Sequence, residues 1–157
     1  MLNLEDKKKF AQETTRVFEP GEIIFTEGDD SREMYIVASG SVEVIKKTKS
    51  AEVHLALLTK GDFVGEMSLL ESLPRSATAR AVGRTKLLVI HPGGFLLKIR
   101  RDPTFAFEML QSLSRRIRMT NESLVKELSQ EKLSSEALRK IVSGSEFSNS
   151  SADKKIA

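Results

Sequence analysis

The sequence predicts a mainly β domain with flanking helices and one long helix towards its C-terminal end. Residues 16 to 92 contain short runs rich in Val, Ile, Leu and Thr, and glycine-containing turns break these runs at short intervals. Many short strands at that spacing are typical of a sandwich, a jelly roll or a barrel. From about residue 103 the apolar residues follow a helical period instead. With 157 residues, the chain has the length of one domain and can bury a sizeable core.

Composition excludes several classes of protein. The chain has no cysteine, which rules out disulfides, thiolate zinc sites and cysteine-held iron–sulfur clusters. The net charge of +3 is weak evidence for nucleic-acid binding, because the Lys and Arg residues are scattered and matched by nearby acids. No apolar run approaches the roughly 20 residues that span a bilayer, and the first ten residues, MLNLEDKKKF, lack the apolar stretch of a signal peptide. We therefore expect a cytoplasmic protein without membrane contact.

The elements of the predicted domain follow in chain order. Residues 1 to about 15 predict a short helix with few apolar contacts. Residues 42–58, VEVIKKTKSAEVHLALL, predict a hairpin with its polar loop around Lys46 to Ser50. The segment Pro92-Gly93-Gly94 ends the β region, and a brief helix is expected around Phe95 to Arg100. The other turns of the β region are expected at Pro20-Gly21, Gly28-Asp29, Ser39-Gly40, Gly61-Asp62 and Gly83.

A long helix is predicted from about Pro103 to Val142, with Asp102 as its N-cap and the proline in its first turn. Its apolar seam has the 3-4-3-4 spacing of a coiled coil and consists of Leu110, Leu113, Ile117, Thr120 and Leu124. One interpretation is an amphipathic helix packed on its own β domain. The other is a helix of about 60 Å that projects and pairs with a partner copy, which predicts a homodimer. Residues 1–142 then form one domain, and the Ser-rich residues 143–157 are expected to be disordered.

The stretch GEMSLLESLPRSATA, residues 65–79, contains a candidate anion site. We expect Val64 to end a strand and Gly65 to allow a close backbone approach. Glu66 to Leu70 can form one helical turn, whose free N–H groups favour an anion. Arg75 then supplies a planar fork that suits two phosphate oxygens.

Three neighbouring residues extend this pattern. Ser76 adds a hydroxyl and a backbone N–H, and Ala77 is small enough for a ligand to lie against it. The Glu66 carboxylate would repel phosphate but would accept a hydrogen bond from a sugar hydroxyl. Together these groups describe a site for a phosphorylated ribose. The alternative is a surface loop with an incidental Glu–Arg pair.

Two segments together resemble a known family. VGEMSL, five further residues and RSATARA closely resemble the phosphate-binding cassette of cyclic nucleotide-binding domains. EGDDSREMYIVASGSVEV resembles the earlier glycine-bounded strand pair of the same fold, with Gly28, Asp29, Tyr35 and Gly40 in place. The resemblance covers roughly residues 16 to 128. It implies a β-roll of about eight short strands, flanked by helices, with a cyclic nucleotide bound inside the roll.

The resemblance also implies roles for individual residues. Glu66 would take the ribose 2′-hydroxyl, and Arg75 would pair with the exocyclic oxygens of the cyclic phosphate. Backbone N–H groups near the sugar and phosphate would come from Gly65, Met67 and Ser76. Leu58 and Val64 would line the apolar side of the pocket, although plain core packing explains them equally well.

The long helix resembles the family in a second way. SRRIRMTNESL is similar to the dimer helix of bacterial catabolite activator proteins, in which a Thr-Ser pair reaches the adenine. Here the pair is Thr120-Asn121, and Asn121 departs from the pattern. A polar Thr120 on the seam is equally explained as a device that sets helix register. Those transcription factors also carry a helix-turn-helix domain, and no such segment follows Val142, so we expect no direct DNA binding and an unknown effector protein as partner.

The function predicted from these observations is a cyclic nucleotide-binding regulatory domain without catalytic residues, metal or cofactor. Cyclic AMP is favoured over cyclic GMP because of Thr120 and because Ser76 replaces a threonine often found in cyclic GMP binders. The alternatives are a cyclic GMP binder and a ligand-free interaction module of the same fold. A phosphodiesterase with Glu66 as general base would need a metal pair or a second acid–base group, and the sequence has no His/Asp cluster for one. For His54 and His91, surface or structural roles are preferred over haem binding.

Overall fold

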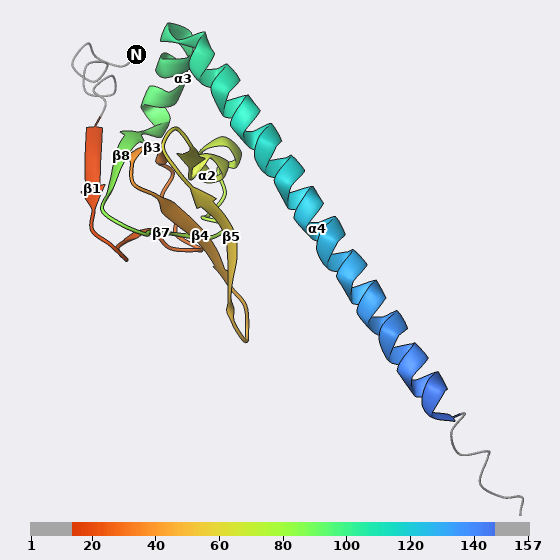
Figure 1. The fold of residues 1–157 in the computed structure, drawn as a ribbon. Coiled ribbons are helices and arrows are strands. Elements are labelled where there is room, and N and C mark those ends of the chain that lie inside the picture. Colours follow the sequence, from red (N-terminus) through yellow and green to blue (C-terminus); the bar gives the residue numbers. More distant parts are fainter. Residues whose placement is uncertain (1–13, 147–157) are drawn as a thin grey trace, which may run out of the picture. The chain divides into compact units, whose positions relative to one another are not determined.

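The computed structural model describes residues 14–146, and within them eight strands form two antiparallel four-stranded sheets (Figure 1). One sheet has the strand order β1-β8-β3-β6 and the other has the order β2-β7-β4-β5. The strands are β1 (Thr14–Phe18), β2 (Ile23–Phe25), β3 (Met34–Ser39), β4 (Val42–Lys47), β5 (Glu52–Leu58), β6 (Phe63–Val64), β7 (Thr78–Ala81) and β8 (Thr85–Ile90). The helices are α2 (Glu66–Glu71), α3 (Pro92–Arg101) and α4 (Pro103–Glu146). The predicted fold class, a β-roll of about eight short strands with flanking helices and a long C-terminal helix, is confirmed.

The core lies between the inward faces of the two sheets. Alternate residues of a strand point to opposite faces, so each strand contributes every second side chain to the core. On β4 and β7, Val42 lies opposite Ala81 and Val44 lies opposite Ala79. The buried cluster consists of Phe18, Phe25, Tyr35, Val37, Val42, Leu58, Val64, Ala79, Ala81, Leu87 and Val89.

The predicted hairpin of residues 42–58 is present as β4 and β5, with register from Val42 opposite Leu58 to Lys47 opposite Glu52. Its turn is later than expected, because β4 continues through both lysines and the turn occupies residues 48–51. Thr48 closes this turn: its backbone N–H and its Oγ1 both donate to the carbonyl of Ala51, at 2.8 and 2.9 Å.

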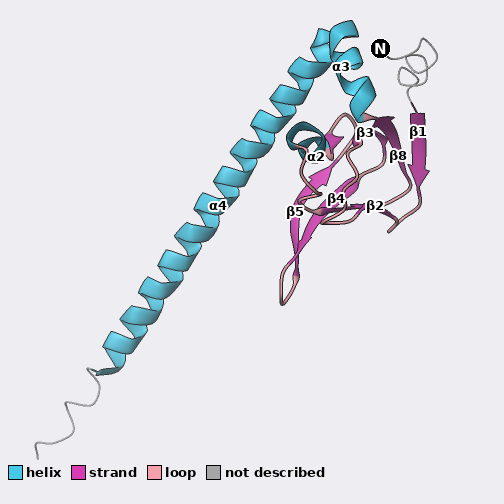
Figure 2. Cartoon of the chain, turned by 180° about the vertical axis from the view of Figure 1, so that it is seen from behind, coloured by secondary structure: helices cyan, strands magenta, loops and turns pink. Residues whose placement is uncertain are grey.

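The helix after the β region begins earlier than expected. It starts at Pro92 rather than near Phe95, because a proline at the first helical position has no N–H to leave unsatisfied. The backbone N–H of Gly94 donates to the carbonyl of His91 at 2.9 Å, which draws the two glycines into the first turn. Figure 2 shows α3 directly after β8, and α2 beside β3.

The start of the long helix agrees with the sequence. Asp102 accepts a hydrogen bond from the backbone N–H of Thr104 at 3.1 Å, and α4 begins at Pro103. Phe105, in its first turn, packs edge-on against Phe63 and Phe95, with ring centroids 5.7 and 6.1 Å apart. This aromatic group anchors the first turns of α4 to the β-roll. The chain divides into two compact units between Ser112 and Leu113, within α4.

Two predicted boundaries are wrong. Thr14 and Thr15, expected at the end of an N-terminal helix, belong to β1 because they pair with Val89 and Leu88 of β8. The rest of that helix, with Leu4, Phe10 and Ala11, falls on residues 1–13, outside the described part. At the other end, α4 continues to Glu146 and includes residues 143–146, which were expected to be disordered.

One serine in this continuation of α4 bonds within the helix. The Ser143 hydroxyl donates to the carbonyl of Lys140 at 3.1 Å, so the serine satisfies its own polar group within the helix. The remainder of the Ser-rich segment lies outside the described residues. Between Thr14 and Glu146, no helix has a stretch both long and apolar enough to cross a membrane.

Candidate functional site

The cassette, defined here as residues 64–79, has the local structure expected from its sequence. Strand β6 ends at Val64, α2 begins at Glu66, and β7 begins at Thr78. Gly65 joins the first two with φ +82, a left-handed conformation that a residue with a side chain rarely adopts. A Cβ atom at this position would lie 2.6 Å from Nη1 of Arg75 and 3.0 Å from the carbonyl oxygen of Glu33. Only glycine leaves room for the arginine.

Arg75 is held in place by three hydrogen bonds from its guanidinium. Nε donates to Ser31 Oγ at 3.0 Å, Nη1 to the carbonyl of Gly65 at 3.0 Å, and Nη2 to the carbonyl of Glu33 at 2.7 Å. Its side chain is only 1% exposed. The guanidinium also lies over the Phe25 ring, 4.1 Å from the centroid. A guanidinium has five N–H donors, so these bonds engage three and fix the plane of the other two.

The backbone of Arg75 reinforces this arrangement. Its N–H donates to the carbonyl of Asp29 at 2.8 Å, and its carbonyl accepts from the N–H of Gly28 at 2.9 Å. The β2–β3 loop, residues 26–33, is therefore bonded to Arg75 through both main chain and side chain. The two segments that resemble the family thus meet at one residue.

Charge and burial act against each other at this arginine. Burial lowers the pKa of the Arg75 guanidinium below its ordinary value, because the charged form loses its hydration. Tyr35 and the negative charges of Glu33, Asp29 and Glu66 oppose that shift. An arginine remains charged under such conditions. Arg75 is therefore a fixed cation, and the carboxylate of Glu33 lies 3.9 Å from its Nη2.

The structure brings the other predicted cassette residues together around Arg75. Glu66 lies in the first turn of α2, is 2% exposed, and is close enough to favour the charged form of Arg75. Met67 and Ser76 are exposed and face each other, with the Ser76 hydroxyl 3.9 Å from the Met67 sulfur.

The remaining predicted residues occupy two different environments. Leu58 and Val64 belong to the buried core cluster, as the packing alternative predicts, and Ala77 is buried as well. Thr120 and Asn121 are exposed on the second compact unit. The Thr120 hydroxyl donates to the carbonyl of Arg116 at 2.9 Å within its own helix. Their roles toward a ligand stay predictions.

Several residues of the site were not found from the sequence. Phe25, Ser31 and Glu33 contact Arg75 although they precede it by at least 42 positions. No spacing rule in a single sequence relates a loop to a side chain so far along the chain. Ser31 and Glu33 lie in the glycine-bounded segment, which was the signal for that loop, whereas Phe25 precedes it.

The two histidines lie at the surface, beside carboxylates. His54 Nδ1 is 3.2 Å from Glu43, and His91 Nδ1 is 3.9 Å from Glu33. Among residues 14–146, no three His, Asp or Glu side chains are grouped so that they would hold a metal ion.

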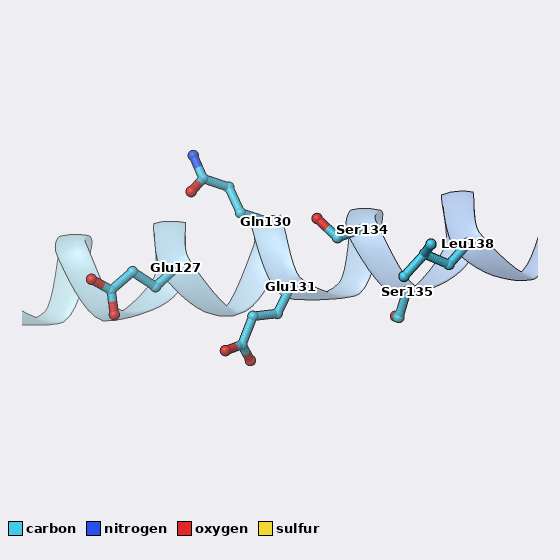
Figure 3. Close-up of a pocket in the computed structure, with 6 residues that line it drawn as sticks. All are labelled: Glu127, Gln130, Glu131, Ser134, Ser135 and Leu138. Atoms are coloured by element: carbon cyan, nitrogen blue, oxygen red, sulfur yellow. The ribbon is translucent and has the colours of Figure 1, made fainter. Parts of the chain in front are cut away.

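A hollow along the second half of α4 is not a binding pocket. It is lined by Glu127, Gln130, Glu131, Ser134, Ser135 and Leu138, which all project from one helix (Figure 3). A single helix provides one wall and cannot enclose a ligand. The hollow instead marks a polar interval in the apolar seam, because Glu131 stands seven residues from both Leu124 and Leu138.

Comparisons with known proteins agree with this geometry. The family model for the cyclic nucleotide-binding domain matches residues 15–102. The Cyclic AMP receptor protein of Thermus thermophilus is 40% identical over 104 residues, which cover 66% of this chain and 48% of that protein. The cAMP-dependent protein kinase regulatory subunit of Yarrowia lipolytica is 43% identical over 82 residues, which cover 52% of this chain and 21% of that protein. The chain thus spans about half or less of these relatives.

Solved structures give the same result for the fold. The Thermus thermophilus Catabolite Activator Protein has a TM-score of 0.65 at 37% identity, over 82% of this chain and 61% of that one. The c-di-GMP responsive global regulator CLP of Xanthomonas campestris has a TM-score of 0.68 at 25% identity, over 76% of this chain and 61% of that one.

Proposed function

Because the chain belongs to the cyclic nucleotide-binding domain family, we propose that it binds cyclic AMP at the cassette and acts as a regulatory module. The observation that supports this most is the fixed guanidinium of Arg75, with two donors beyond its three protein bonds. A guanidinium can donate to two oxygens of one phosphate, so these N–H groups would meet the exocyclic oxygens of a cyclic phosphate. Backbone N–H groups of Gly65, Met67 and Ser76 would complete the anion site.

The sugar would be recognised by Glu66. Its carboxylate is buried in the first turn of α2, near Arg75, and an ionised carboxylate only accepts hydrogen bonds. The ribose 2′-hydroxyl is the donor that such a group would accept from. One end of the site would then bind an anion and the other a hydroxyl, as cyclic nucleotides require.

Cyclic AMP is preferred over cyclic GMP on two grounds. Thr120 stands where the family's dimer helix reaches the adenine, and Ser76 replaces the threonine of many cyclic GMP binders. The names of the two curated relatives above refer to cyclic AMP. Cyclic GMP is the alternative ligand, and an interaction module without ligand is the alternative function.

We also propose that α4 transmits the signal within a homodimer. Its seam residues Leu110, Ile117 and Leu124 are exposed in the single chain, and a partner helix would bury them. An effector protein would then receive the signal from the paired helices.

Labelled cyclic AMP tests these proposals in one assay. We expect saturable binding, displacement by unlabelled cyclic AMP at lower concentration than by cyclic GMP, and intact ligand after hours of incubation. Stronger displacement by cyclic GMP would favour the alternative ligand, loss of intact ligand would indicate an enzyme, and absent binding would favour the interaction module.

A further inference from the structure

A charged pair, Lys46 and Glu27, lies against the cassette. Lys46 Nζ donates to the carbonyl of Ser76 at 2.8 Å and lies 3.1 Å from Oε1 of Glu27. The backbone N–H of Glu27 donates in turn to Thr78 Oγ1 at 2.9 Å. The pair is therefore attached to the segment directly after Arg75.

The position of Lys46 on its strand is consistent with a place in the ligand site. Val42 lies in the core, Val44 packs against it, and both lie opposite small residues of β7. Lys46 follows on the same strand, directly after the buried Ile45, and its side chain is half exposed. Its ammonium bonds the cassette at the carbonyl of Ser76.

A second cation near Arg75 would help to offset the negative charge of a bound phosphate. The carboxylate of Glu33 lies 3.9 Å from Nη2 of Arg75, and the charges of Asp29 and Glu66 also act on this guanidinium. An arriving phosphate would add a further negative charge to one cation and three carboxylates. Arg32 does not meet this need, because it donates to the carbonyl of Ser72 at the far end of α2.

A purely structural role explains Lys46 poorly. Its side chain is 48% exposed and that of Glu27 is 32% exposed. Ion pairs at such exposure contribute little to stability, because water screens them. An ammonium also has three donors, so the bonds to Ser76 and Glu27 leave one for a ligand.

We propose that Lys46 is a second phosphate-binding cation of the cyclic nucleotide site and that Glu27 competes with the nucleotide for it; this rests on the proposed function. Binding of the phosphate would draw Lys46 from Glu27 toward the anion. Removing the charge of Lys46 would then weaken nucleotide binding, and removing the charge of Glu27 would strengthen it.

Three variants test this by titration with cyclic AMP and cyclic GMP at low and high salt. Lys46→Met retains the unbranched stem without the charge and should weaken both nucleotides by about tenfold at low salt. Glu27→Gln should strengthen both by about two- to fivefold, because it releases Lys46. Lys47→Met, one position along the same strand, is the matched control and should bind as the parent does. The loss in Lys46→Met should shrink at high salt, since the cation is partly exposed.

The outcomes separate the two proposals. A parent that binds neither nucleotide overturns the proposed function and this inference with it. A parent that binds, with Lys46→Met equal to it, overturns the inference alone. Weaker binding in both Lys46→Met and Glu27→Gln indicates a structural ion pair and also overturns it. A loss in Lys46→Met confined to cyclic GMP would place Lys46 at the base, against the phosphate assignment.

Discussion

Replacing Arg75 tests whether one side chain both holds the cassette together and binds the ligand. Arg75→Ala removes three hydrogen bonds from a charged donor, each contributing about 1.5–3 kcal/mol. It also removes a cation from the face of Phe25, a contact that contributes about 0.5–2 kcal/mol. The total is a large part of the about 5–15 kcal/mol that stabilises a typical domain. We therefore expect Arg75→Ala to be strongly destabilised.

Arg75→Lys separates the two roles, because lysine keeps the charge but lacks the planar fork. We expect a smaller loss of stability and at least a tenfold loss of cyclic AMP affinity, since about 1.4 kcal/mol corresponds to a factor of ten. In Arg75→Ala, the folded fraction should bind at least about 30-fold more weakly, because a buried phosphate without its counter-charge costs about 2–5 kcal/mol.

Urea unfolding and calorimetric titration on the same samples provide the two readouts. Arg84→Ala is the matched control, because the Arg84 side chain is 76% exposed and lies 3.6 Å from Glu19. It should match the parent in both measurements. Parental stability in Arg75→Ala would contradict the bonding described here, and parental affinity in both Arg75 variants would refute its role in binding.

Three further variants probe the rest of the account. Gly65→Ala imposes a left-handed conformation costing about 1–2 kcal/mol and displaces Arg75, so unfolding free energy and cyclic AMP affinity should both fall; unchanged affinity by titration would show that Arg75 needs no such fit. Glu66→Ala should weaken cyclic AMP more than its 2′-deoxy analogue, and equal losses for the two ligands would argue against a ribose contact. Leu124→Asp should lower both dimer content in sedimentation and nucleotide affinity, whereas Val125→Asp, one position off the seam, should not; a monomeric Leu124→Asp that binds as tightly as the parent would separate α4 from the sensor.

The cassette was predictable because its signals are local. A strand end at Val64, a glycine before Glu66 and a short helical turn are all specified by neighbouring residues, and each is present. The partners of Arg75 were not predictable. Ser31 and Glu33 reach it only because the sheets bring the β2–β3 loop alongside the cassette, and Lys46 reaches Ser76 from another strand again.

Element ends were predicted less well for a similar reason. The start of α3 at Pro92 follows the preference for proline at the first helical position. The two glycines after Pro92 made a turn the more obvious prediction. The strand at Thr14 depends on pairing with β8, which no local pattern reveals. The serines near Lys140 favour disorder by composition, yet Ser143 bonds within the helix.

Hydrogen–deuterium exchange of the parent protein with and without cyclic AMP tests for a nucleotide site around Arg75, because it reports both binding and its location. We expect slower exchange in two segments, residues 64–79 and residues 26–35, which Arg75 joins through its bonds to Gly28, Asp29, Ser31 and Glu33. No comparable change is expected in the 48–51 turn. Exchange that is unaltered in the cassette at saturating cyclic AMP, or protection confined to other segments, would contradict a nucleotide site built around Arg75.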